Sequence, residues 1–267
     1  MEYIVWFDQF SFIVLFGAVV LSSFAALEIG YRLGQYRRKQ ASREKMEAGG
    51  VAVPSILALL AFILAFTFGM AGSRFDDRKT AILEEANAIG TAYLRTELVP
   101  ASDQEAARAL LREYVDIRIK GLQDFEYLPQ VIVRSKEIHA ALWAVAVEIA
   151  NQYPPSVNHS LFIQSINDVI DLHEKRVATG LYNRIPDAIW LALYTISILA
   201  MVATGFQPGL AGSRRTMASI FLTLTFSCIL LLIAVLDRPE YGKNIISQQV
   251  LVDLQTEMKK SLPSMSK

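Results

Sequence analysis

The sequence predicts an all-α integral membrane protein in which four transmembrane helices carry a four-helix, water-facing domain between the second and third spans. Of its 267 residues, 53% are apolar and only 19% are charged, which is too apolar for a typical soluble chain. Four stretches are free of charge and long enough to cross a bilayer core, which needs about 20 apolar residues in a helix. None shows the alternation of a barrel strand, so helices that satisfy their own backbone groups are expected.

The four charge-free stretches cover residues 10–27, 48–73, 188–213 and 216–236. The first is retained as a span rather than a cleaved signal peptide, because the residues before it carry Glu2 and Asp8 and no positive charge. The chain is therefore divided into spans one and two with a basic loop (1–73), a helical extramembrane domain (74–186), spans three and four (187–236) and a C-terminal tail (237–267).

The distribution of basic residues bears on orientation in the cell (inner) membrane. The connection between spans one and two, residues 34–50, is short and contains Arg37, Arg38, Lys39, Arg43 and Lys45. The connection between spans three and four carries Arg214 and Arg215. Short basic loops stay in the cytoplasm, so loop 34–50 is expected there and both termini and the domain on the outer side. Basic residues near the opposite span ends, such as Arg184 and Arg238, weigh against this orientation.

The inserted domain is expected to contain four helices, because its apolar residues recur at three- and four-residue spacing. Breaks are expected at Pro100, Gly121, Pro129 and Pro154. The first helix continues span two through residues 73–98, since Gly90 is the one residue there that disfavours a helix and a single glycine is tolerated.

The second domain helix is expected to begin at a capping box made by Ser102 and Glu105. The third covers residues 130–152 and the fourth residues 157–178. Pro186 and Asp187 then suit the first turn of span three. A short internal similarity, Gly-Met-Ala-Gly-Ser-Arg at 69–74 and Gly-Leu-Ala-Gly-Ser-Arg at 209–214, ends spans two and three, and either chance or an inverted repeat could produce it.

The sequence excludes most catalytic classes. It has no phosphate-binding glycine loop, no HExxH motif and no nucleophile elbow, and its spans offer few polar groups, chiefly Ser and Thr with Glu28 near an end. No enzyme activity, cofactor or metal site is expected. Cys228 is the only cysteine, which excludes an intramolecular disulfide. Basic residues are scattered at zero net charge, so nucleic acid is not an expected partner.

Polar residues of the domain are expected to face water. His139 and His159 are interpreted as solvated or locally bonded. The densest polar cluster comprises Asp168, Asp171, His173, Glu174 and Lys175. Pairs at i,i+4 on a solvated helix face explain it, with metal binding as the alternative.

Two groups of residues in span two are candidates for an ion pathway. Ala58, Phe62 and Phe66 recur at four-residue spacing with Met70 alongside, and we expect Arg74 to continue this face two turns later. The charged group Arg74, Asp77 and Arg78 follows where the span ends. Aromatic rings and charges at a helix mouth suit a pore, whereas lipid-facing aromatics and interface anchors are the alternative.

Residues 66–78 (FTFGMAGSRFDDR) and 85–95 (EANAIGTAYLR), with Leu-Asp-Arg-Pro at 236–239, resemble the bacterial bestrophin-like family. That family in turn distantly resembles bestrophins, which are pentameric anion channels. The resemblance implies a homo-oligomer, with a pentamer as the model, that lies in the lipid bilayer and conducts small anions. It also implies a cytosolic domain and termini, opposite to the orientation that the loop charges favour.

Two departures qualify the resemblance to bestrophin channels. Those channels carry a tryptophan pair where this chain has Phe75 and Asp76, and the acidic calcium-binding run of animal members is absent. Calcium gating is therefore not expected. The sequence predicts a channel with a neck at Ala58, Phe62, Phe66 and Met70, a mouth at Arg74, Asp77 and Arg78, and the domain as vestibule. The alternative is a membrane-anchored sensor or scaffold whose domain binds a ligand or partner protein.

Overall fold

The computed structural model describes residues 11–40, 52–123, 127–213, 217–238 and 249–260, and helices are the only regular elements among them. The chain divides into two compact units. The span unit comprises Met1–Phe75 and Arg184–Arg238, and the domain unit comprises Asp76–Asn183 and Pro239–Lys267. The long helix α2 contributes its first half to the span unit and its second half to the domain unit.

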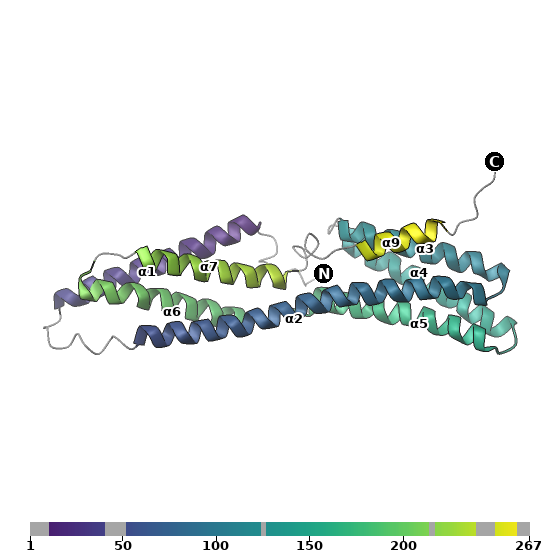
Figure 1. Ribbon diagram of the computed structural model, residues 1–267, viewed down its shortest axis with the longest axis horizontal. Coiled ribbons are helices and arrows are strands. Elements are labelled where there is room, and N and C mark those ends of the chain that lie inside the picture. Colours follow the sequence, from purple (N-terminus) through teal and green to yellow (C-terminus); the bar gives the residue numbers. More distant parts are fainter. Residues whose placement is uncertain (1–10, 41–51, 124–126, 214–216, 239–248, 261–267) are drawn as a thin grey trace. The chain divides into compact units, whose positions relative to one another are not determined.

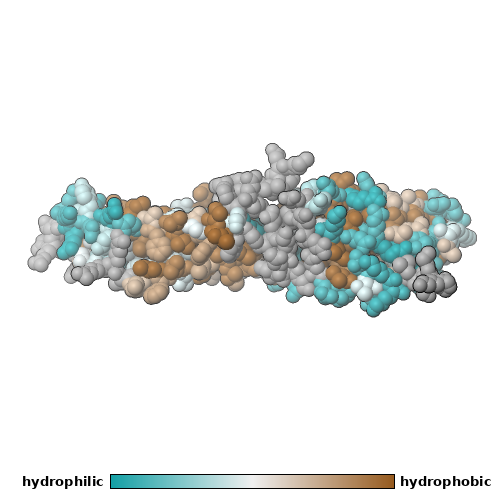
Figure 2. Space-filling view, turned by 90° about the horizontal axis from the view of Figure 1, so that it is seen from above, coloured by the Kyte–Doolittle hydropathy of each residue, from teal (hydrophilic) through white to brown (hydrophobic). Residues whose placement is uncertain are grey.

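The span unit contains α1 (Phe12–Gln40), the first half of α2 (Ala52–Arg95), α6 (Asp187–Ala211) and α7 (Met217–Asp237), which lie side by side (Figure 1). These are the four helices long and apolar enough to cross a membrane among the described residues. Figure 2 shows apolar residues over the span unit and polar residues over much of the domain unit. The prediction of an all-helical chain with four candidate spans is confirmed, and span three begins at Asp187 as expected.

Helix α1 is longer than predicted. Residues 34–40, expected to start the basic loop, continue the helix to Gln40. Arg, Lys and Gln are good helix formers, and Gly34 is held against α6, so nothing ends the helix at this glycine. The remainder of the predicted loop lies outside the described residues.

The closest helix pair in the span unit is α1 with α6, and glycines make the approach possible. Gly30 and Gly34 of α1 face Val202 and Phe206 of α6, where an added Cβ would lie 2.0 and 2.3 Å from the carbonyl oxygens. Gly205 and Gly209 of α6 meet α1 in the same way. Contacts advance along both helices together, so α1 and α6 run parallel. Small residues four apart let two backbones touch in lipid, where packing rather than water exclusion drives association.

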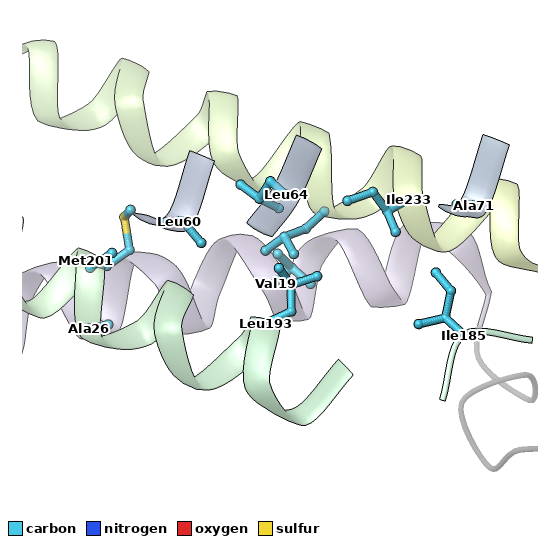
Figure 3. Close-up of a cluster of buried hydrophobic side chains, with 11 residues drawn as sticks. Val19, Ala26, Leu60, Leu64, Ala71, Ile185, Leu193, Met201 and Ile233 are labelled. Atoms are coloured by element: carbon cyan, nitrogen blue, oxygen red, sulfur yellow. The ribbon is translucent and has the colours of Figure 1, made fainter. Parts of the chain in front are cut away.

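The core of the span unit joins all four helices (Figure 3). Val19 of α1, Leu64 of α2, Leu193 of α6 and Ile233 of α7 point toward one another and are between 0 and 6% exposed. Each helix therefore has one face inside the unit, and this fixes which face of α2 remains outside.

The domain unit is built from the second half of α2, α3 (Ala101–Gln123), α4 (Leu128–Gln152), α5 (Val157–Val177) and α9 (Gln249–Lys260). Helix α2 continues to Arg95 and ends in a 3₁₀ turn, η4 (Thr96–Leu98), which confirms the predicted continuity of span two with the first domain helix. Its buried residues, among them Ile82, Ala86 and Ile89, pack inside the domain unit.

One local expectation, the capping box of the second domain helix, needs correction. Helix α3 begins at Ala101, where the carbonyl of Pro100 accepts hydrogen bonds from the amides of Asp103 and Gln104 at 3.0 and 3.1 Å. Ser102 therefore lies inside the first turn and forms no capping box, because the preceding proline already provides the helix start. Helix α5 is followed by a π-helical turn, η6 (Ala178–Tyr182). The predicted tail contains α9, whose Leu251 and Met258 are buried in the domain unit.

The two similar hexapeptides differ in structure. Gly69 and Gly72 face open space, with no atom within 4 Å of an added Cβ. Gly209 instead packs against Tyr31 of α1, and Gly212 ends α6 with a φ of 68°. The similar segments therefore have different surroundings: residues 69–72 lie on an open helix face, whereas residues 209–212 form a packed helix end.

Candidate functional site

Helix α2 leaves one face uncovered within its own chain. Leu60, Leu64 and Ala71 are 0 to 2% exposed in the core of the span unit (Figure 3). On the other side, Phe62 and Phe66 are 69% and 65% exposed. Ala58 is exposed with them, and Met70 is half-buried at the edge of this face. Ala58, Phe62 and Phe66, here called the phenylalanine face, therefore lie together as the sequence predicts, available to lipid, another subunit or a pore.

Arg74 does not continue the phenylalanine face. At about 100° per residue, each four-residue step turns roughly 40° further around the helix, so Arg74, twelve residues after Phe62, lies about 120° away from it. Its guanidinium lies 3.8 Å from the Asp237 carboxylate on α7, and both side chains are mostly buried. Asp237 also accepts a hydrogen bond from the Ile185 amide at 2.9 Å. Arg74 thus forms an ion pair that connects α2 with the C-terminal end of α7 inside the span unit.

The other two predicted mouth residues point in different directions. Asp77 is exposed, whereas Arg78 is only 6% exposed. Arg74 and Arg78 are one turn apart on α2, and both are mostly buried in the subunit. The assignment of Arg74, Asp77 and Arg78 to a pore mouth stays a prediction.

A buried ionic cluster in the domain unit was missed by sequence reasoning. The Glu85 carboxylate of α2 is 0% exposed and pairs with Arg118 of α3 at 3.3 Å and with Arg176 of α5. The Tyr114 hydroxyl donates to Glu85 at 2.6 Å, and Nδ1 of His173 lies 2.9 Å from the same hydroxyl. Since that hydroxyl donates its proton to Glu85, His173 donates from Nδ1. The cluster joins three helices through one carboxylate.

The electrostatics of this cluster favour an ionised Glu85. Burial raises the pKa of the carboxyl, but the charges of Arg118 and Arg176 and the hydrogen bonds from His173 and Tyr114 outweigh it, so the pKa lies far below its usual range. Burial, and then the charge of Glu85, raises the pKa of the Tyr114 hydroxyl. Both groups therefore keep fixed protonation states near neutral pH.

The histidines are placed differently from expectation. His139, predicted to be solvated or locally bonded, is 6% exposed and its ring packs edge-on against His173, with centroids 4.8 Å apart. Burial and the neighbouring His173 lower its pKa to about 4, so it is neutral at pH 7. His159 lies at the start of α5, where its amide donates to the Ser156 side chain at 3.1 Å.

The predicted polar cluster of α5 divides between two faces. Asp171 is exposed and Asp168 is half-buried, and they accept hydrogen bonds from Asn167 and Gln164, respectively, one turn earlier, in keeping with a solvated face. His173 instead points into the core at 0% exposure. Within the described residues no group of three or more His, Cys, Asp or Glu side chains could hold a metal ion.

A signal for the buried cluster was present in the sequence. Glu85 lies three residues after Ile82 and four before Ile89, on the apolar stripe of the helix. Arg118 follows Tyr114, and Arg176 follows His173, at similar helical spacing. A charged residue on an apolar stripe implies a buried partner.

Comparisons with known proteins give two matches. A family model described as "Bestrophin-like domain" matches residues 20–251. Among solved structures, a mutant of a bacterial bestrophin homologue from Klebsiella pneumoniae is similar with a TM-score of 0.62 and 13% identity, over 93% of this chain and 99% of that chain. At this identity the likeness shows a common fold. No curated protein matches.

Proposed function

Because the chain belongs to the bestrophin-like family, we propose that it assembles into a homo-oligomeric ion channel in which α2 of each subunit lines a central pore. The domain unit lies outside the bilayer in this proposal, as a vestibule. One four-span subunit is too small to enclose such a pore, so the function depends on assembly.

The observation that carries the proposal is the phenylalanine face. The opposite face of α2 is packed in the span unit, so Phe62 and Phe66 must be covered by something outside the chain. Small residues accompany them, since Ala58 is exposed and Gly69 faces open space. Around a symmetry axis this face would form stacked phenylalanine rings, and apolar rings control ion passage by losing water from the constriction.

Anions are the favoured permeant ions. The likeness of the family to bestrophin channels is what supports this proposal. The charges next to the proposed neck do not, because Arg74 and Arg78 are mostly buried in the subunit and the exposed Asp76, Asp77 and Lys79 carry no net positive charge.

A membrane-anchored sensor or scaffold is the second candidate. It is favoured by α9, which follows the last span yet packs in the domain unit, where Tyr93 of α2 donates to the Met258 carbonyl at 3.4 Å. The C-terminal helix could thereby report a ligand or partner bound to that unit. In this case the phenylalanine face would contact lipid or a neighbouring helix.

Mass measurement in mild detergent and ion flux in reconstituted vesicles test the channel. We expect an oligomer, and we expect the double variant F62A/F66A to increase flux several-fold because smaller side chains keep the neck hydrated. Phe221→Ala is the matched control, since Phe221 of α7 is 65% exposed outside the proposed neck. Replacing chloride with gluconate should abolish the flux, whereas replacing potassium with a bulky cation should not.

Two outcomes would contradict the proposal. A strict monomer excludes a pore between subunits. Background flux from an F62A/F66A protein that assembles like the parent would remove the neck assignment and favour the scaffold.

A further inference from the structure

The buried ionic cluster of the domain unit contains more positive than negative charge. The guanidiniums of Arg118 and Arg176 both pair with the carboxylate of Glu85, and neither has another acidic partner among the described residues. The side chains of Arg118, Arg176 and Glu85 are 4%, 8% and 0% exposed. Two positive charges against one negative charge leave the cluster with a net charge of +1 in the core of the domain unit.

Neighbouring acidic side chains do not supply the missing negative charge. Glu84 and Glu174 are engaged at the surface, where they pair with Lys175 and Lys136 at 2.6 and 3.6 Å. The Tyr114 hydroxyl stays neutral, because burial and the charge of Glu85 raise its pKa. A buried charge without a counter-charge is strongly unfavourable, so the excess guanidinium charge calls for an anion from outside the chain.

Two nitrogens beside the cluster also lack a hydrogen-bond partner. Nε of Arg118 and Nε2 of His139 are buried, and neither has a partner among the described residues. Both groups lie around Tyr114, whose ring centroid is 4.9 Å from that of His139 and 6.0 Å from the guanidinium carbon of Arg118. Nε2 of His173 is unpartnered as well, but that ring donates from Nδ1, so its Nε2 is an acceptor. The unused donors are therefore those of Arg118 and, with its proton on Nε2, His139.

We propose that the domain unit encloses a small monovalent anion such as chloride, held by the guanidinium of Arg118 and the Nε2–H of His139. One negative charge neutralises the cluster, whereas a divalent anion would reverse its sign and a water molecule would leave the charge uncompensated. Arg118, Arg176 and His139 are only 4 to 8% exposed, so the ion is enclosed as the domain unit folds and stabilises it. The proposal stands independently of whether the protein conducts ions.

Thermal unfolding of the full chain in detergent tests it, in sodium chloride and in sodium gluconate at equal ionic strength and neutral pH. We expect the melting temperature to rise with chloride concentration and to stay lower in gluconate, because a ligand that binds only the folded state stabilises it by mass action. Arg118→Gln removes the excess positive charge and should abolish the dependence on chloride. His139→Phe keeps an aromatic ring but removes the donor, and it should weaken the apparent chloride affinity several-fold.

Arg134→Gln is the matched control, because Arg134 is 48% exposed and pairs at the surface with Glu113 and Glu137. It should keep the chloride dependence of the parent. Crystals grown in bromide give a direct measurement, since an anomalous peak should lie beside Arg118. Equal melting temperatures of the parent in the two salts, or an unchanged chloride dependence in folded Arg118→Gln protein, would overturn the proposal. If Arg118→Gln does not fold, an unchanged dependence in His139→Phe would overturn it equally, as would the absence of bromide beside Arg118.

Discussion

At the scale of single residues, the buried carboxylate of Glu85 connects α2 to α3 and α5 in the domain unit. It is surrounded by Arg118, Arg176 and Tyr114 and is 0% exposed. With Tyr114 and His173 equally buried, a soluble substrate has no access to the cluster, which argues for a stabilising role. A buried ion pair adds little over an apolar replacement, yet losing one member leaves uncompensated charge in the core.

Replacement of Glu85 by Gln should destabilise the domain unit by about 3–5 kcal/mol, since two buried guanidiniums would lose their counter-charge. The neighbouring Glu84 provides a matched control, because it pairs with Lys175 at 2.6 Å on the surface, with side chains 39% and 54% exposed. Glu84→Gln should cost about 0–1 kcal/mol. Urea unfolding followed by circular dichroism measures both, and equal costs would refute a structural role for the buried cluster.

His139 should make the domain unit sensitive to mild acid. Its pKa is lowered to about 4 in the folded protein, so the unfolded chain, near 6.5, binds the proton more readily. Stability is therefore complete above about pH 6.5 and is lost as pH falls toward 4. Charged and titratable groups around it come from α2, α3, α4 and α5, namely Glu85, Arg118, Tyr114, Lys136 and His173.

His139→Gln should flatten this loss between pH 6.5 and 4, as measured by melting temperature across that range. Glu85 adds to the slope only below about pH 5, where the unfolded carboxyl takes up a proton and the folded one does not, so the part of the profile between about pH 6.5 and 5 reports His139. An unchanged pH profile in the variant would show that another group carries the dependence.

At the scale of elements, the glycine contact between α1 and α6 organises the span unit. An added Cβ at Gly30 would lie 2.0 Å from the Val202 carbonyl oxygen, a backbone atom that cannot move aside without shifting the helix. Apolar surface is not excluded from lipid as it is from water, so the fit of the two backbones determines which helices pair.

Gly30→Ala should therefore lower stability in detergent by about 1–3 kcal/mol, the usual cost of overpacking. Gly17→Ala on the same helix is the control, because nothing lies within 4 Å of the added methyl group. Alanine favours a helix over glycine by roughly 0.5–1 kcal/mol, so the control should be neutral or more stable. Thermal unfolding distinguishes them, and a tolerated Gly30→Ala would show that the helices separate readily.

At the scale of the whole molecule, the charges near the ends of the spans bear on membrane orientation. The described end of α1 carries Arg37, Arg38 and Lys39, all exposed. The sequence adds Arg214 and Arg215 between α6 and α7. From the positive-inside rule we therefore expect residues 34–50 on the cytoplasmic side.

We expect a cysteine at Gln40 to be protected from an impermeant thiol reagent in intact cells, and one at Ser102 to be labelled, in a Cys228→Ser background. Both positions are exposed, so access to the reagent depends on membrane side. Labelling at residue 40 with protection at residue 102 would establish the opposite orientation, which the likeness to bestrophin channels implies.

The sequence by itself determined the properties that are local to the chain. The long charge-free stretches predicted the four spans, and the positions of proline and glycine predicted most helix boundaries. The lack of a helix-breaking residue between span two and the domain predicted that α2 is continuous. Spacing also placed Phe62 and Phe66 on one face, because helical geometry fixes which residues share a side.

Only the tertiary structure decided which faces meet. Lipid-facing and protein-facing residues are equally apolar in a span, so the packed glycines of α1 and α6 could not be distinguished from the open Gly69 by composition. The ion pairs of Glu85 with Arg118 and Arg176 join residues that lie far apart in the sequence. Helix α9 packs in the domain unit although a transmembrane span separates it from that unit in the sequence. Periodicity shows that a helix has a buried side, whereas the choice of partner for that side depends on contacts between segments distant along the chain.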